Sequence, residues 1–277
     1  MRVPVLTYHG VNIAGNDYRG NDHVAFAADL ALIQRLGLRI VPLWQVVENA
    51  LGLAAHDINR AVALSCDDGS DFDYHDLDHP THGRQRSFYN ALLDFCAAYG
   101  RDAQPRLHLT SFVIADPAAR AQMDRTCLVG RGWMSEAWWR AAQASGLMAI
   151  ENHSWDHNHP CLPDPGPHGL VRGDFHAVAD EAQAEHEIAQ AQAWLGQRLA
   201  PHRPSLFCYP FGHVNDFLRR DWLPRRGAAV GLCAAFGDGA EPVTADADRW
   251  NLPRYICGWH WKSPAELEAI LRRDVGA

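Results

Sequence analysis

The sequence of 277 residues lacks an apolar run approaching the ~20 residues that a membrane-spanning helix needs. It also lacks an excess of positive charge, since 25 Lys and Arg against 33 Asp and Glu give a net charge of −8. This balance argues against nucleic acid or an anionic membrane surface as the main partner. There is no Cys-x-x-Cys pair, so we expect the seven cysteines to be reduced thiols that pack as small apolar residues. Residues 1–9 turn polar too soon for a secretory signal, which predicts a cytoplasmic protein.

The chain also shows no internal repeat, low-complexity tract or clear linker, so we expect residues 1–277 to form a single domain. Short apolar runs alternate with helical patterns. Strands are predicted at 3–7, 38–41, 61–66, 109–115, 147–150, 206–208 and 230–234, and helices at 26–36, 42–51, 87–99, 135–146, 175–199 and from 263 onward. The alternation predicts an α/β fold with a mostly parallel sheet and helices outside it. Residues 70–86 and 160–174 are predicted to be long loops that wall a substrate groove.

Polar side chains follow the ends of several predicted strands, and in α/β barrels this end carries the chemistry. Asp67 and Asp68 are adjacent, and two like charges so close resist joint ionisation unless a cation binds one of them. His153 and His157, four residues apart, can share such an ion with one carboxylate and leave positions open for water and substrate. An isolated Asp-Asp-Gly is usually an ordinary turn, but its combination with His-x-x-x-His predicts a metal site beside a free base.

These segments resemble the motifs of a known family. Residues 66–69, Cys-Asp-Asp-Gly, resemble the Thr/Ser-Phe-Asp-Asp-Gly motif of polysaccharide deacetylases, the NodB-like carbohydrate esterase family 4. Residues 152–157, Asn-His-Ser-Trp-Asp-His, resemble the family's Asn-His-Ser/Thr-x-x-His motif. The resemblance implies a distorted (β/α) barrel, a divalent metal ion and removal of an N-acetyl group from a sugar. It also implies that Asp67 is the general base and that Asp68, His153 and His157 bind the metal.

The third family motif is matched by residues 208–212, Cys-Tyr-Pro-Phe-Gly, which resemble the Tyr-Pro-Tyr-Gly version of some branches. By this resemblance Tyr209 and Phe211 belong to the oxyanion and substrate site, where the backbone N–H of Phe211 would bind the tetrahedral oxyanion. The arginine that normally orients the base is replaced by Cys208, and we consider Arg254 as its substitute. Trp250 could line an acetyl pocket like the aromatic residue of the fourth motif.

The last family motif, a Leu-x-His whose histidine protonates the departing amine, is missing, since no histidine follows Trp261. Residues 3–9 resemble that strand moved to the front of the chain. Such a permutation occurs in the branch that resembles poly-N-acetylglucosamine deacetylases, and it makes His9 the candidate acid. The alternative reading of His9 is a histidine hydrogen-bonded within a turn.

The sequence therefore predicts a metal-dependent hydrolase that acts on an N-acetylated sugar, with water activated by the ion as nucleophile. Zinc is the expected ion, with cobalt or nickel as alternatives, because imidazole and carboxylate ligands suit all three. Two other functions stay open: hydrolysis of another small amide by the same site, and a non-catalytic sugar- or metal-binding module. A phosphoesterase would need further ligands for a second ion and basic groups for phosphate, and neither stands out. The sequence does not reveal the oligomeric state.

Overall fold

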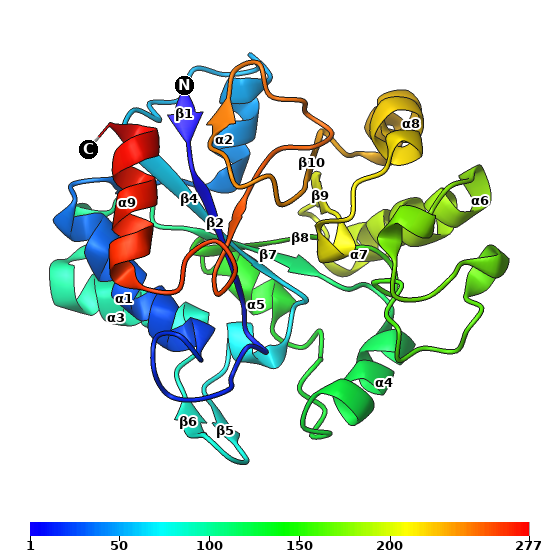
Figure 1. The fold of residues 1–277 in the computed structure, drawn as a ribbon, viewed down its shortest axis with the longest axis horizontal. Helices are drawn as coiled ribbons and strands as arrows, with labels where there is room; N and C mark the ends of the chain where they lie inside the picture. Colours follow the sequence, from blue (N-terminus) through cyan, green and yellow to red (C-terminus); the bar gives the residue numbers. More distant parts are fainter. Residues whose placement is uncertain (277) are drawn as a thin grey trace.

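The centre of the structure, a computed structural model that describes residues 1–276, is a curled parallel sheet (Figure 1). Its strand order is β10-β9-β8-β7-β4-β2-β12, with β3 paired to β4. The strands are β2 (Val5–His9), β3 (Arg39–Ile40), β4 (Ala61–Asp67), β7 (Leu109–Val113), β8 (Met148–Asn152), β9 (Leu206–Cys208), β10 (Ala234–Phe236) and β12 (Tyr255–Ile256). A bridge between Phe236 and Leu252 links β10 to the segment that leads into β12. The sheet is a half-barrel with helices around it, which confirms the predicted distorted (β/α) barrel.

Helices pack around this sheet, with α1, α3 and α9 together on one flank and α6, α7 and α8 on the other (Figure 1). They are α1 (Asp22–Arg35), α2 (Leu43–Ala50), α3 (Phe88–Tyr99), α4 (Pro117–Cys127), α5 (Trp139–Ala144), α6 (Glu181–Ala184), α7 (Ala191–Arg198), α8 (Leu223–Val230) and α9 (Pro264–Val275). Two π-helical segments, η5 (Glu185–Gln190) and η7 (Phe217–Trp222), lead directly into α7 and α8. Short 3₁₀ turns are η1 (Asp71–Asp73), η2 (Arg101–Ala103), η3 (Pro167–Gly169), η4 (Phe175–Ala177) and η6 (Pro210–Gly212). Within residues 1–276, no helix combines the length and apolarity that crossing a bilayer requires.

Two small antiparallel pairs lie outside the main sheet. β1 (Arg2–Val3) pairs with β11 (Val243–Thr244), and β5 (Leu77–His79) pairs with β6 (Gly83–Gln85). The second pair is a hairpin inside the stretch 70–86, which we predicted to be loop. The other predicted loop, 160–174, is irregular apart from the short turn η3.

The alternation of side chains along the strands decides what faces the barrel interior. On β4, Leu64 and Cys66 pack into the outer core beneath the helices, whereas Ala63 belongs to the inner core. Because successive side chains of a strand point to opposite faces, Asp67 lies on the inner side with Ala63. The register pairs Asp67 with His9 on β2, and both residues end their strands. The fold therefore brings these two polar side chains to the same rim of the barrel.

Several predicted element boundaries were wrong because side-chain hydrogen bonds override the apolar pattern. α1 begins at Asp22 rather than 26, since the Asn21 side chain accepts the backbone N–H of His23 and caps the helix. The predicted helix 135–146 begins only at Trp139. The Ser135 hydroxyl donates to Asp71 instead, at 2.9 Å from Oδ1, and so ties the segment to η1.

The C-terminal half differs more from the prediction. The predicted helix 175–199 begins at Glu181, where Asp180 caps it by accepting the N–H of Gln183. The predicted strand 230–234 was wrong: α8 ends at Val230, Gly231 adopts the left-handed conformation, and β10 begins at Ala234. The predicted C-terminal helix is α9, which Ser263 caps, because its Oγ accepts the N–H of Glu266.

Candidate active site and metal centre

A cavity of about 390 Å³ opens at the carboxyl end of the strands and gathers polar and apolar side chains from distant segments. Its walls are His9, Val11, Asp67, Asp68, Met123, Cys127, Leu128, Met134, His153, His157, His159, Phe211, Gly212, Asp238, Arg254, Ile256 and Trp259. The cavity thus contains seven of the nine residues that the sequence singled out, including both adjacent carboxylates and both imidazoles of the motif. The other two, Tyr209 and Trp250, do not line it, and the cavity instead adds apolar residues that the sequence did not mark.

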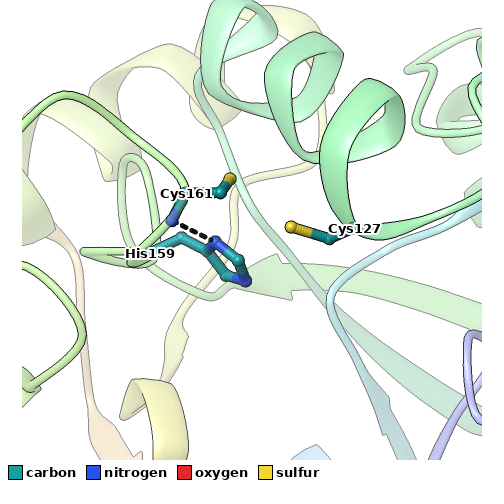
Figure 2. A group of neighbouring side chains, drawn as sticks. All are labelled: Cys127, His159 and Cys161. Atoms are coloured by element: carbon teal, nitrogen blue, oxygen red, sulfur yellow. Dashed lines mark hydrogen bonds between the residues drawn. The ribbon is translucent and has the colours of Figure 1, made fainter.

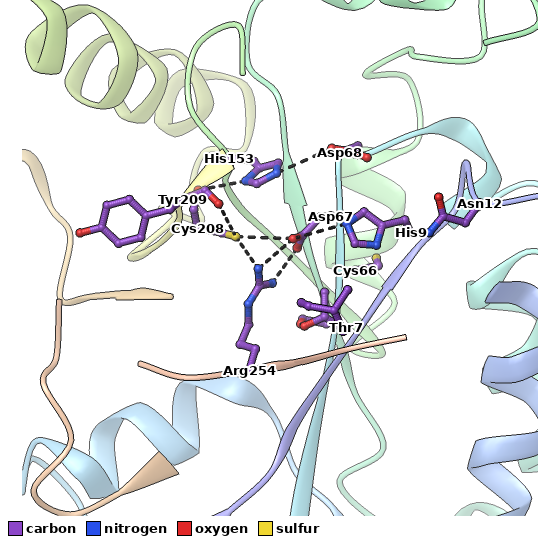
Figure 3. Close-up of polar contacts among 12 residues, drawn as sticks. Thr7, His9, Asn12, Cys66, Asp67, Asp68, His153, Cys208, Tyr209 and Arg254 are labelled. Carbon is purple, nitrogen blue, oxygen red and sulfur yellow. Dashed lines mark hydrogen bonds and ion pairs between the residues drawn. The ribbon is translucent and has the colours of Figure 1, made fainter. Parts of the chain in front are cut away.

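Asp67 is buried at the end of β4 and is held by Arg254 (Figure 3). Arg254 Nη1 donates to Asp67 Oδ1 at 2.8 Å, and Nη2 donates to Oδ2 at 2.9 Å, so the two side chains form a bidentate ion pair. Burial alone would raise the pKa of Asp67, but the charge and hydrogen bonds of Arg254 hold it well below its usual range. Asp67 is therefore ionised at neutral pH.

Arg254 reaches Asp67 from the segment just before β12, and Cys208 makes room for it. Arg254 Nε donates to the Gly237 carbonyl at 3.1 Å, which fixes the plane of the guanidinium. Its Nη2 also lies 2.8 Å from Cys208 Sγ. The small side chain at position 208 leaves space for an arginine that arrives from a different strand. The structure thus brings to Asp67 the substitute that we considered from the sequence.

Asp68, His153 and His157 form a second group on the same rim. Asp68 Oδ1 lies 3.7 Å from His153 Nε2 and 3.6 Å from His157 Nε2. These separations are too long for hydrogen bonds. Two ligand atoms about 2.1 Å from a tetrahedral zinc ion would be roughly 3.4 Å apart, close to the spacing seen here.

The donor chemistry of this group also fits a divalent cation. His153 Nδ1 lies 2.9 Å from the Cys208 carbonyl and donates to it, which leaves the Nε2 lone pair facing Asp68. Burial lowers the pKa of both imidazoles, so both rings are neutral and able to act as ligands. Asp67, His153 and Cys208 are also close enough to share an ion, but Arg254 occupies both Asp67 oxygens and would repel a cation there. Asp68, His153 and His157 are therefore the better ligand set.

Unusual backbone conformations orient the side chains of Asp68 and His157. Asp68 has a φ of 76° and His157 a φ of 63°, both in the left-handed region that L-residues rarely adopt. The turn after Asp68 needs glycine, because a Cβ on Gly69 would lie 2.5 Å from Val113 Cγ1. Such strain persists where the surrounding structure fixes it, as it does at functional sites.

His9 lies next to Asp67, on the side away from Cys208 and His153 (Figure 3). Its Nε2 is 4.0 Å from Asp67 Oδ2, and about a quarter of its side chain is exposed to the cavity. The His9 backbone N–H donates to Asp22 Oδ2 at 2.7 Å, which anchors the strand end to the start of α1. The imidazole is thus accessible from the cavity while its backbone is fixed.

The third motif is divided between the cavity and the core. Phe211 lines the cavity in a left-handed turn with a φ of 59°, and its ring packs 4.4 Å from that of His157. Tyr209 is fully buried, and its hydroxyl donates to the Trp250 carbonyl at 2.8 Å. Trp250 packs in the same core cluster as Tyr209. These two side chains support the wall from behind, and the structure does not bring either of them to the cavity as substrate contacts.

Other cavity residues carry no motif and were missed. Trp259 is 77% exposed at the rim, and Met123, Leu128 and Met134 form an apolar wall. A glycine precedes Trp259 in the sequence, but nothing local distinguishes this tryptophan from the others, and its exposure follows only from the fold. The methionines lie on and after α4, a helix without any motif, and their proximity follows only from the fold.

The chain is similar to known proteins in sequence and in fold. Residues 55–222 match the polysaccharide deacetylase family. The fold is similar to that of IcaB from Ammonifex degensii (19% identity, 98% of this chain and 97% of that chain, TM-score 0.61). It is also similar to the deacetylase PplD from Streptococcus pyogenes in complex with acetate (17% identity, 98% of each chain, TM-score 0.59). A de-N-acetylase from Aggregatibacter actinomycetemcomitans gives a TM-score of 0.63 at 14% identity over 97% of this chain and all of that one.

No curated protein sequence is significantly similar to the chain. The family match nevertheless covers more than half of it and includes Asp67, Asp68, both motif histidines and the turn at Phe211. The solved structures share its fold across nearly the whole length. The chain therefore belongs to the polysaccharide deacetylase family, whose members are hydrolases of C–N amide bonds in N-acetylated carbohydrates.

Proposed function

We propose that this protein is a metal-dependent deacetylase that removes N-acetyl groups from a carbohydrate. The observation that carries the proposal is the pairing of an ionised, uncoordinated Asp67 with the ligand set Asp68, His153 and His157 in one cavity. When bound, a divalent ion, of which zinc best suits these ligands, supplies Lewis acidity toward the acetyl carbonyl and toward water. All other steps are assigned to residues of this chain.

Asp67 is proposed to accept the proton of the attacking water. Each carboxylate oxygen has two lone pairs, and Arg254 uses one of them on each oxygen. The ion pair lowers the basicity of Asp67, but it also keeps the carboxylate free of a proton at neutral pH. Arg254 is thus a positioning residue that orients the carboxylate and keeps it ionised.

His9 is proposed to protonate the amine nitrogen as acetate leaves. Its Nε2 is near Asp67 and open to the cavity, so a proton accepted by Asp67 has a short path to the imidazole. The anchoring bond from its backbone to Asp22 keeps the ring at a fixed distance from the base. This arrangement supports the permuted motif predicted from the sequence, in which the acid comes from the first strand of the sheet.

Phe211 is proposed to stabilise the oxyanion through its backbone N–H. Its left-handed turn lies against His157, so the backbone of the turn borders the ligand set. This role does not depend on the aromatic ring. A substitution of Phe211 by leucine should therefore retain most of the activity, whereas a change of backbone conformation should not.

Acetate release from N-acetylglucosamine oligomers of increasing length tests the proposal. The metal-loaded protein should release acetate, and the Asp67→Asn protein should lose at least about 100-fold in kcat while keeping its metal. Asp102→Asn is a matched control, because Asp102 is an exposed carboxylate away from the cavity. Absence of acetate release from every oligomer by the metal-loaded protein would contradict the proposal, as would a fully active Asp67→Asn protein.

A further inference from the structure

Two cysteines and a histidine meet at the edge of the cavity, outside the ligand set described above. Cys127 is the last residue of α4, while His159 and Cys161 follow the histidine motif on the loop after β8 (Figure 2). One ligand atom from each residue lies within 4.8 Å of those of the other two. Cys127 and His159 also line the cavity, so an ion could reach them from solvent.

We propose that Cys127, His159 and Cys161 form a second metal site, which binds a thiophilic cation of the Zn²⁺ or Cu⁺ class. Thiolate and imidazole are the ligands that such ions prefer, whereas the set at Asp68 offers one oxygen and two nitrogens. The two sites therefore differ in the softness of their ligands. Three protein ligands leave a fourth position open.

The present spacing is close to what ligation requires. With Zn–S bonds of about 2.3 Å and tetrahedral angles, two sulfur ligands would be roughly 3.8 Å apart, so the group needs to contract by about 1 Å at most. Cys127 is exposed at a helix end and Cys161 lies in an irregular loop, so both can make this movement. Binding displaces the two thiol protons into solvent.

The surroundings of the group are also suited to a soft ion. Cys161 packs against a small apolar cluster that includes Met123 and Met134, so sulfur atoms and apolar side chains surround the site. The Cys161 backbone N–H donates to His159 Nδ1 at 3.1 Å and holds the ring beside the sulfur atoms (Figure 2). Ligation through Nε2 would require the ring proton to move to Nδ1 and this bond to be given up.

Occupancy of the site would join α4 to the loop that carries the catalytic histidines. The rings of His159 and His157 are 5.9 Å apart, so a cross-link at His159 acts close to a ligand of the first site. The second ion would thus fix one wall of the cavity. It is not needed for the hydrolytic chemistry proposed above.

Titration with Cd²⁺ under reducing conditions tests the second site, because cadmium bound to thiolate gives an ultraviolet charge-transfer band. We expect the wild-type protein to develop this band with one equivalent of Cd²⁺ and the Cys127→Ser/Cys161→Ser protein to lose it. Cys208 is retained in both proteins, so any contribution from it cancels in the difference. Cys96→Ser/Cys233→Ser is the matched control, since both thiols are half-buried elsewhere, and it should keep the band.

A second variant separates this site from the first. The His153→Ala protein, in which the first ligand set is broken, should still develop the band with one equivalent. An unchanged band in the Cys127→Ser/Cys161→Ser protein would overturn the proposal. So would a Cys127–Cys161 disulfide, found by peptide mapping of the protein isolated without reductant, where two of the seven thiols would be missing. None of these readouts depends on deacetylation, so failure here is distinct from failure of the proposed function.

Discussion

Replacement of Arg254 by methionine tests how far the site depends on one buried ion pair. The change removes both hydrogen bonds to Asp67 and the bond to the Gly237 carbonyl, while the side chain keeps a similar length. Asp67 then remains buried without a partner. Removing one member of a buried ion pair costs about 3–5 kcal/mol, so we expect the free energy of unfolding to fall by this amount at neutral pH.

The effect should depend on pH in a defined direction. In the wild-type protein the folded-state pKa of Asp67 is depressed, so its contribution to stability is present above its unfolded value of about 3.9 and is lost as the pH falls. Without Arg254, burial is no longer opposed by that charge and raises the pKa of Asp67. The variant should therefore lose stability as the pH rises above about 4, and the acid limb of kcat/KM should move to higher pH.

Urea unfolding of Arg254→Met, Asp67→Asn and the double variant gives the coupling between the two side chains. We expect a coupling energy of about 2–3 kcal/mol. The stability of Arg254→Lys should lie between those of the wild type and Arg254→Met, because lysine keeps the charge but cannot form the bidentate pair. Arg203→Met is the control, because Arg203 is exposed and lies outside the site. A coupling energy below about 0.5 kcal/mol, or an acid limb that does not move, would refute the reasoning.

Three further predictions concern other groups. His9→Gln should lower kcat about 100-fold or more with unchanged metal content, and full activity would remove His9 as the acid. His153→Ala should lose most of its bound metal by elemental analysis, whereas unchanged stoichiometry would exclude it as a ligand. Burial raises the pKa of Glu151 to about 8, so stability should fall as the pH rises from its unfolded value of about 4.3 through about 8. Glu151→Gln should flatten this fall in urea unfolding, by up to about 1.4 kcal/mol per pH unit, and an unchanged profile would contradict it.

The sequence predicted the sheet and the main motifs because their signals are local. Apolar runs marked β2, β4, β7 and β9, since a strand buried on both sides is apolar along its length. The adjacent carboxylates and paired imidazoles follow such strands directly, so their meeting at one rim could be expected from parallel topology. In the structure, the carboxylate oxygen of Asp68 and the Nε2 atoms of His153 and His157 are spaced as one ion would require.

Other features depended on long-range contacts that no local pattern reveals. β10 and β12 are only two or three residues long, and their apolar content is too short to distinguish them from loops. The contact of Arg254 with Asp67 joins residues far apart in the chain, so the motif alone could name Arg254 only as a candidate substitute. The predicted helix 135–146 began too early because the Ser135 hydroxyl binds Asp71, a contact between segments far apart in the chain.

The strand order has a consequence for synthesis of the protein. β4 and β8 lead into Asp67, Asp68 and the two imidazoles proposed as ligands, and Arg254 leaves the ribosome after all of them. Until Arg254 arrives, burying Asp67 would place an unpaired charge in the interior, so we expect the nascent chain to keep this carboxylate hydrated or protonated. The proposed ligand set would thus be assembled before the proposed base has its ion-pair partner.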